Sequence, residues 1–425
     1  MKLLQLGSVG PSVQFLQLAL RRAGYSEIIP DGIFGPVTRS AVTDFQRKNA
    51  LVPDGTAGQY THSALMPYYL GYVKHRVRPG DSFFTLARQY GSSVSAIEIA
   101  NPGADSKNLT PGSFLTVPLG FDVVPTGTDY SSFLISCCVR ALTARYPFLK
   151  LSEIGRSVMG NALWCMSFGR GNNRVLYNAS HHANEWITTA LLLKYTEELC
   201  RAFSSDGTVF SQNAREIFDY CTLALIPAVD PDGIDLVTGE LSGGDFFNYA
   251  YRLSLDYPQY PFPSGWKANI RGIDLNLQYP AGWEQARENK ALLGITSPAP
   301  ADYVGSAPLT APESRAMYDF TLSFMPFLTL SCHTQGEVIY WKYLDYTPYN
   351  SRVIADVFSS ASGYALEDTP FASGFAGYKD WFIETFDRPG YTIEAGRGTN
   401  PLPLSQFDKI YNDNLGILTL GTVVT

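Results

Sequence analysis

The stretch RVLYNASHHANEWITT, residues 174–189, joins a short apolar run to two adjacent histidines and the start of a helical pattern. The run is rich in β-branched and aromatic residues, which predicts a buried strand, and the amphipathic residues 184–203 predict a helix. His181 and His182 are two of only five histidines in the chain, and Glu185 lies three positions after the second. The stretch is therefore either a polar corner of the core or part of a metal site.

Three further apolar runs have the same character as the first. They are TLALIPA (222–228), FLTLSC (327–332) and YTIEAG (391–396), and helix-length amphipathic stretches such as 311–325 lie between them. Strands that alternate with helices are typical of an α/β domain. The sequence therefore predicts a mixed, largely parallel sheet covered by helices on both faces, in a domain that spans residues 131–425.

The polar residues that follow these runs are the candidates for chemistry, because ligands bind beyond the carboxyl ends of the strands in such sheets. His182 and Glu185 are three positions apart at the start of the predicted helix, so both side chains turn to one side. His333 follows FLTLSC and would complete a set of two histidines and one glutamate with a fourth position open to water, as in catalytic zinc sites. Without His333, a hydrogen-bonded core histidine and a surface acid would be the simpler interpretation.

The segment RGIDLNLQYPAGW, residues 271–283, adds a candidate partner for this site. Asp274 could accept the free N–H of a zinc-bound imidazole and fix its tautomer. Asn276, two positions on, would face the same way in an extended segment. Cys332 precedes His333 on the predicted strand, so it should point to the opposite face and is not an expected ligand. The six cysteines form no CxxC pair and are expected to be reduced core residues.

Residues 1–67 contain three short helical patterns joined by Asp-Gly turns. The segments DGIFGPVTRSAVTDFQ (31–46) and PDGTAGQYTHSAL (53–65) resemble the three-helix peptidoglycan-binding domain. Residues 72–118 are predicted to form strand, helix, helix and strand, and VRPGDSFFTLARQYG, IEIANP and LTPGSFLTVP resemble a LysM module. This resemblance implies binding to glycans that contain N-acetylglucosamine, such as peptidoglycan. Residues 119–130, with Pro, Gly and Thr, are expected to be a linker.

Five motifs then occur in the order used by the carboxypeptidase A-like zinc peptidases: HHANEWITT, VDPDG, WKANIRGIDLN, SCHTQG and YTIEAG. The chain resembles this family over about residues 130–420. The resemblance implies an α/β zinc peptidase fold and one zinc ion per chain. The implied zinc ligands are His182, Glu185 and His333.

The same resemblance assigns expected roles around the zinc ion. Glu394 would be the general base, and Asp274 would support His182. Lys267 would take the position of the family's arginine that polarises the scissile carbonyl, and Arg271 is the alternative. A base that removes a proton from water and a cation that stabilises the oxyanion are the parts that amide hydrolysis needs.

The segment DLNLQ, residues 274–278, departs from the exopeptidase pattern DxNRN. Leu277 stands where an arginine would hold the substrate's terminal carboxylate, and a leucine cannot pair with a carboxylate. Together with KDW and EAGRGTNPLP, this departure resembles the branch of γ-D-glutamyl-L-diamino acid endopeptidases. That branch cuts the bond between γ-D-glutamate and meso-diaminopimelate in peptidoglycan stem peptides. Arg397 and Asn276 are the candidates for binding the substrate's free carboxylates.

Two other functions stay open. One is a zinc carboxypeptidase that trims wall peptides, and the other is a non-catalytic wall-binding protein whose peptidase domain is a relic. The complete ligand set together with Glu394 favours an enzyme. The expected partners are therefore the glycan strands and stem peptides of peptidoglycan.

The charge balance excludes other partners. With 32 Lys+Arg against 39 Asp+Glu, the net charge of -7 does not suit nucleic acid. No apolar stretch reaches the roughly 20 residues that cross a bilayer, so no membrane span is expected. The N-terminal MKLLQLGSVGPSVQ lacks the core of an export signal. The location stays open between the cytosol, a cell wall reached after lysis, and a developing spore.

Overall fold

The computed structural model describes residues 1–424 and divides into two compact units, Met1–Lys150 and the part from Leu151 onward. All six cysteines are buried and free, as predicted. No helix within the described residues has the length and hydropathy that crossing a membrane requires.

The first unit begins with the three predicted helices. They are α1 (Pro11–Arg22), α2 (Pro36–Lys48) and α3 (Gln59–Leu70). Two buried glutamines tie the Asp-Gly turns to the helices: Gln17 accepts the N–H of Gly32, and Gln46 accepts that of Gly55, both at 2.9 Å. A buried backbone N–H needs such a partner, so these side chains hold the two Asp-Gly turns in place.

A strand–helix–helix–strand segment follows, as the LysM resemblance implies. Its elements are β1 (Tyr72–Arg76), α4 (Phe83–Tyr90), α5 (Val94–Ala100) and β2 (Phe114–Pro118). The two strands pair antiparallel, and Leu86, Ile97 and Val117 meet in a small buried core. Ser82 caps α4 by accepting the N–H of Thr85, and the Thr85 hydroxyl accepts the N–H of Ser82.

Helix α6 (Ser132–Arg145) also belongs to the first compact unit. Residues 119–130 before it contain no helix or strand, although Val123 and Tyr130 are buried. The boundary between the compact units thus falls at Lys150, after α6.

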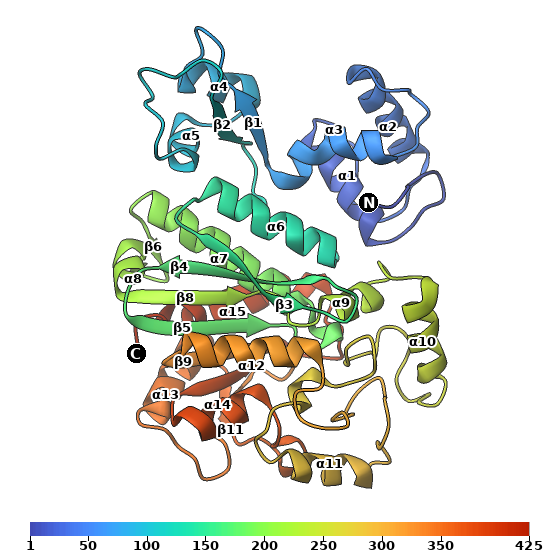
Figure 1. Ribbon diagram of the computed structural model, residues 1–425, viewed down its shortest axis with the longest axis vertical. Helices are drawn as coiled ribbons and strands as arrows, with labels where there is room; N and C mark the ends of the chain where they lie inside the picture. Colours follow the sequence, from blue (N-terminus) through green and yellow to red (C-terminus); the bar gives the residue numbers. More distant parts are fainter. Residues whose placement is uncertain (425) are drawn as a thin grey trace. The chain divides into compact units, whose positions relative to one another are not determined.

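The second unit is built on one sheet of eight strands in the order β11-β10-β12-β9-β5-β8-β4-β3. The strands are β3 (Lys150–Arg156), β4 (Ala162–Gly169), β5 (Asn173–Ala179), β8 (Cys221–Ile226), β9 (Leu328–His333), β10 (Val338–Tyr340), β11 (Ala365–Glu367) and β12 (Gly390–Glu394). The neighbours β12, β9, β5 and β8 are parallel and correspond to the four predicted apolar runs. Figure 1 labels β9, β5 and β8 of this group. β4 and β10 pair antiparallel with β8 and β12. The predicted mixed, largely parallel sheet is confirmed.

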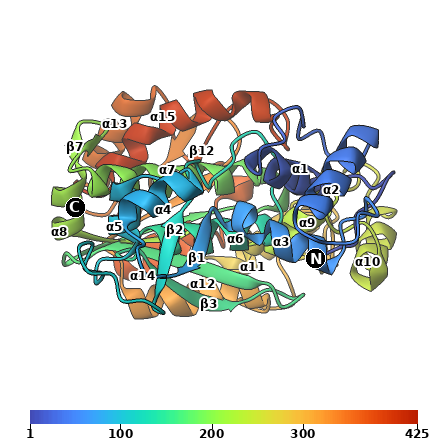
Figure 2. The same ribbon diagram turned by 90° about the horizontal axis from the view of Figure 1, so that it is seen from above.

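Helices cover both faces of this sheet, as predicted. The helices of the second unit are α7 (Ile187–Ser204), α8 (Ala214–Tyr220), α9 (Pro231–Val237), α10 (Gly244–Ser254), α11 (Trp283–Leu292), α12 (Pro312–Phe324), α13 (Ser351–Ser362), α14 (Tyr378–Phe386) and α15 (Phe407–Leu420). Figure 2 shows α13 and α15 on one side of the strands and α12 and α14 on the other. Accordingly, Tyr177 of β5 donates its hydroxyl to Leu418 O of α15 at 2.8 Å. Its neighbour Leu176 packs in one cluster with Met317 of α12 and Phe382 of α14.

The strand register brings the predicted polar residues to one edge of the sheet. Glu394 lies opposite His333 in the ladder of β12 and β9, and Ala179 lies opposite Cys332 in the ladder of β5 and β9. Parallel strands end at the same edge, so the loop that follows β5 meets the end of β9. That loop carries His182.

Candidate metal centre

The three predicted zinc ligands converge. His182 precedes the short 3-10 turn Ala183–Glu185, and His333 is the last residue of β9. Glu185 Oε1 lies 2.8 Å from His182 Nδ1, and Glu185 Oε2 lies 2.8 Å from His333 Nδ1. One ligand atom from each residue lies within 4.8 Å of the other two, and all three residues are buried.

This arrangement fits a divalent cation. The Nδ1 atoms of His182 and His333 lie 3.2 Å apart, with the Glu185 carboxylate against both. Two imidazoles and one carboxylate are a ligand set of catalytic zinc sites. A cation between the two ring nitrogens would use both lone pairs at once, whereas two neutral imidazoles facing each other can use only one hydrogen bond.

Asp274 lies behind His182, as predicted. Its Oδ1 is 3.3 Å from His182 Nε2, which favours the tautomer with its lone pair on Nδ1. The carboxylate also accepts the N–H of Asn276 at 3.1 Å and that of Asp302 at 3.2 Å. The expectation of an extended segment was wrong here, because residues Leu275–Leu277 form a 3-10 turn that Asp274 caps. Asn276 nevertheless lines the cavity beside the centre.

The two adjacent histidines have different environments. His181 is fully buried, lies 3.0 Å from the Tyr279 hydroxyl through Nε2, and stacks on the His333 ring with centroids 5.8 Å apart. Burial holds the pKa of His181 well below its ordinary value, so this imidazole stays neutral. His181 is thus a core residue that supports the ring of His333, and His182 is the one that turns to the centre.

A cavity of about 230 Å³ lies against the centre. His182, His333, Glu394 and Lys267 line it. Lys267 Nζ is 3.7 Å from Glu185 Oε1, so this ammonium reaches the centre. The predicted base and the predicted cation therefore face the same space as the predicted ligands.

The protonation states of these groups follow from burial and mutual charge. Burial opposes the charged form of His182, but Glu185 outweighs it and raises the pKa of His182 to about 9. Burial and the Glu185 carboxylate raise the pKa of Glu394 to about 8. Burial would lower the pKa of Lys267, but Glu185 and then Asp274 raise it to about 12.

Two predicted substrate-binding residues are not brought to the cavity. Arg271 is exposed on a turn, and it does not line the cavity, whereas Lys267 does. Arg397 follows β12, and its exposed guanidinium lies 2.6 Å from Glu337 Oε2. The loop after β12 turns Arg397 toward Glu337 and away from the cavity, which sequence spacing alone does not reveal.

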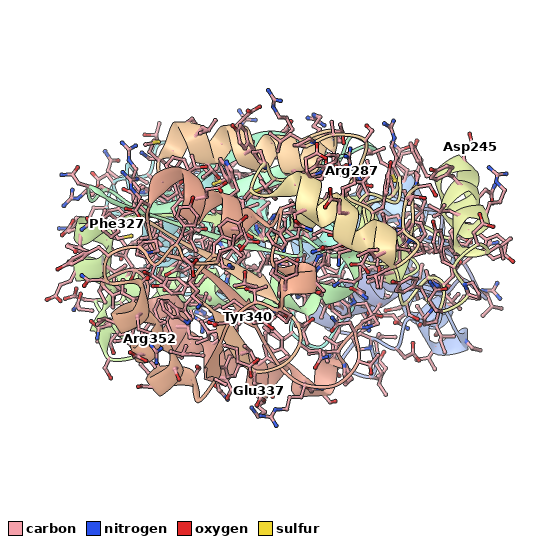
Figure 3. The ribbon with its side chains drawn as sticks, turned by 90° about the horizontal axis from the view of Figure 1, so that it is seen from below. Asp245, Arg287, Phe327, Glu337, Tyr340 and Arg352 are labelled. Carbon is pink, nitrogen blue, oxygen red and sulfur yellow. The ribbon has the colours of Figure 1, made fainter. Side chains whose placement is uncertain are left out.

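Several cavity residues were not predicted. They are Lys290, Asp302, Tyr340, Lys379 and Asp380. Tyr340, labelled near the middle of the view in Figure 3, is the last residue of β10 and pairs with Thr392 in the β12 ladder. Lys379 and Asp380 belong to the KDW motif, and this motif could have identified them as cavity residues. Lys290 and Asp302 stand in no motif, and only the fold brings them to the cavity.

The VDPDG motif has a structural role in this chain. Asp230 caps α9 by accepting the N–H of Gly233 at 2.9 Å. Asp232 accepts the Ser157 hydroxyl at 2.6 Å and the N–H of Met159 at 2.7 Å. Neither carboxylate lines the cavity.

The fold and the three ligands define a metallopeptidase of the carboxypeptidase type. A zinc carboxypeptidase family model matches residues 135–416, and this chain belongs to that family. The "Putative peptidoglycan binding domain" model matches residues 9–65, and the LysM domain model matches residues 75–118.

Two relatives have the same level of identity. Gamma-D-glutamyl-L-diamino acid endopeptidase 1 of Lysinibacillus sphaericus is 41% identical over 296 residues, which is 69% of this chain and 72% of the relative. Uncharacterized protein YqgT of Bacillus subtilis (strain 168) is 41% identical over 276 residues, 64% of this chain and 72% of the relative.

Solved structures are similar in fold. Bovine thrombin-activatable fibrinolysis inhibitor, in complex with tick carboxypeptidase inhibitor, has a TM-score of 0.54 at 17% identity over 70% of this chain and 97% of that one. Carboxypeptidase A from Helicoverpa armigera has a TM-score of 0.51 at 14% identity over 91% of this chain and 95% of that one. The carboxypeptidase A-like fold is thereby confirmed.

Proposed function

We propose that this chain is a zinc-dependent peptidoglycan hydrolase that cleaves the bond between γ-D-glutamate and meso-diaminopimelate in stem peptides. The observation that carries the proposal is Leu277, which lines the cavity beside Asn276. The family's exopeptidases are expected to place an arginine there for the terminal carboxylate, and an apolar side chain cannot replace it. The 41% identity to a protein named as a γ-D-glutamyl-L-diamino acid endopeptidase supports the same substrate class.

The proposed centre holds one zinc ion per chain through His182, Glu185 and His333. When bound, zinc supplies a Lewis acid that makes water acidic near neutral pH. Asp274 holds His182 in the tautomer that ligation requires. The donor set and the convergence of three buried side chains support this assignment.

The proposed catalytic steps use the chain's own groups in the cavity. Glu394 takes a proton from the attacking water and passes it to the departing amine, and it lines the same cavity as His182 and His333. The Lys267 ammonium stabilises the negative charge that develops on the scissile carbonyl oxygen. Asn276 Oδ1 accepts the N–H of Tyr378 at 3.0 Å, which leaves its amide N–H groups to bind a substrate carboxylate.

The proposed anchors for the insoluble substrate are the two N-terminal modules, since both family models describe wall-associated binding domains. Tethering raises the local concentration of substrate without adding a catalytic contact. The full-length chain depleted of zinc by a chelator should therefore still co-sediment with insoluble peptidoglycan. Loss of co-sedimentation together with the zinc would contradict the tethering role.

The activity is tested by incubating the zinc-loaded full-length chain with L-Ala-γ-D-Glu-meso-diaminopimelate and with its D-Ala-extended tetrapeptide. Mass spectrometry should find L-Ala-D-Glu from both peptides. Release of D-Ala alone from the tetrapeptide would instead indicate a trimming carboxypeptidase.

A Glu394→Gln variant provides the matched control for that assay. It should bind zinc but lose about 10²–10⁴-fold in rate, because the general base is missing. Undiminished hydrolysis by the variant would refute the proposed mechanism. Absence of hydrolysis by the zinc-loaded wild-type chain would favour the non-catalytic wall-binding alternative.

A further inference from the structure

The cavity contains two ion pairs that hydrolysis does not use. Lys290 of α11 lies with Nζ 2.7 Å from Asp302 Oδ1, and Lys379 of α14 pairs with Asp380 Oδ1. All four residues line the cavity. A diamino acid differs from other amino acids by a second amine, so a cavity that selects one needs a carboxylate to receive that amine.

Four carboxylates line the cavity, and three of them already have other hydrogen-bond partners or a proposed catalytic role. Glu394 is the proposed base, and Asp274 is bound to His182 and to two backbone N–H groups. Asp380 accepts from Lys379 and from the N–H of Gly377, and only 5% of its side chain is exposed.

Asp302 is the carboxylate with room for a ligand. Its side chain is 31% exposed, against 8% for Lys290. Oδ1 accepts from Lys290, and Oδ2 accepts a long hydrogen bond of 3.3 Å from the Tyr260 hydroxyl. A carboxylate accepts about four hydrogen bonds, so Asp302 retains acceptor capacity.

The three cavity lysines can be compared in the same way. Lys267 faces Glu185 at the centre, and Lys379 donates to Asp380 and, at 2.7 Å, to Lys342 O. Within the described residues, Lys290 donates to Asp302. An ammonium has three donors, so Lys290 can also donate to a ligand.

The backbone holds Asp302 in an uncommon conformation. Its φ is 68°, in the left-handed region that costs free energy for a residue other than glycine. In this conformation its N–H reaches Asp274 Oδ2 at 3.2 Å, while its carboxylate stays in the cavity beside Lys290.

We infer that the Lys290–Asp302 ion pair recognises the distal end of the diamino acid. The inference rests on the proposed function. In meso-diaminopimelate the distal carbon carries an ammonium and a carboxylate, so Asp302 binds the ammonium and Lys290 binds the carboxylate. A lysine side chain offers only the ammonium. The chain should therefore prefer diaminopimelate stems to lysine stems.

The test measures kcat/KM of the full-length zinc-loaded chain on L-Ala-γ-D-Glu-meso-diaminopimelate and on the matching L-lysine peptide. Lys290→Met should lower the value about tenfold or more for the diaminopimelate peptide and leave the lysine peptide little changed, since one charge-assisted hydrogen bond is lost. Asp302→Asn should lower the values for both peptides, because both carry the distal ammonium. Zinc content and the melting temperature report whether each variant is folded.

A matched control comes from the same helix. Arg287 forms an exposed ion pair with Glu284 and is labelled on α11 in Figure 3. Arg287→Met should retain the wild-type preference. A preference that persists in folded Lys290→Met, or that disappears in Lys379→Met instead, would overturn the inference. A wild-type chain that cleaves neither peptide would refute the proposed function itself, which distinguishes the two failures.

Discussion

The Nδ1 atoms of His182 and His333 lie 3.2 Å apart although 151 positions separate the residues in the chain. Neighbouring parallel strands bring them together, since Ala179 at the end of β5 pairs with Cys332 in β9. The end of β9 and the loop after β5 thus bring both imidazoles to the same place. We therefore expect zinc, if it binds the folded chain alone, to stabilise the fold as well as to serve the proposed catalysis.

Removal of zinc should lower the melting temperature of the full-length chain, and added zinc should restore it. A cation that binds only the folded state stabilises by about 2.7 kcal/mol at 100 times its dissociation constant. His333→Ala should abolish the shift, which is measured by differential scanning fluorimetry. Cys332→Ala, at the neighbouring buried position, should retain it. Equal shifts in both variants would contradict the assigned ligand.

Asp274→Asn should weaken zinc binding about 10–100-fold, because the partner of a ligating imidazole sets its tautomer and orientation. Competition with a chromophoric chelator measures the affinity directly. Asp319→Asn, at an exposed residue paired with Arg315, is the control and should bind zinc as the wild type does. Wild-type affinity in the Asp274 variant would mean that the 3.3 Å contact with His182 has no role in ligation.

Lys267→Met should lower kcat by about 10²–10³-fold, as loss of an oxyanion-stabilising group does. Arg271→Met should leave kcat unchanged, because Arg271 is exposed and does not line the cavity. Steady-state kinetics on the stem tripeptide distinguishes the two residues. The opposite ranking would assign the oxyanion to Arg271.

Glu313 should make stability depend on pH. It is buried and accepts the N–H of Val158 at 2.9 Å and an amide N–H of Asn269 at 3.2 Å. Burial raises its pKa from 4.5 to about 7. Between these values the folded chain binds more protons than the unfolded chain, so the free energy of unfolding falls as pH rises through this window.

In Glu313→Gln the free energy of unfolding should fall with pH by up to about 3 kcal/mol less than in the wild type, because the amide does not ionise. Urea unfolding of the metal-free protein at pH 5 and pH 8 measures the difference. Glu284→Gln, at an exposed position, should show the wild-type dependence. If the free energy of unfolding of the Glu313 variant fell between pH 5 and pH 8 by as much as that of the wild type, the titrating group would not be Glu313.

The sequence predicted the central sheet and the convergence of His182, Glu185 and His333 because both depend on local signals. Each apolar run became a strand, and the polar residues directly after a run reached the sheet edge, as His333 and Glu394 illustrate. The conformation at Asn276 was not predicted, because the cap by Asp274 turns a short polar segment into a 3-10 turn.

Residues outside strands were harder to place. Arg397 was expected in the site because it follows Glu394 closely, but its direction depends on the pairing with Glu337. Lys290 and Asp302 belong to a helix and a loop with no motif, and only the packing of the chain makes them neighbours. Long-range pairs of this kind leave no periodic pattern in a single sequence.

The ladder between β12 and β9 has one more implication, for how activity appears during refolding. Glu394 and His333 occupy one rung, and side chains along a strand alternate between faces. A slip of a single residue would turn the proposed base away from the proposed ligands, so we expect a chain with misaligned strands to show no turnover. The hydrolytic activity recovered after dilution from denaturant should therefore report the fraction of molecules whose strands have paired in the native register.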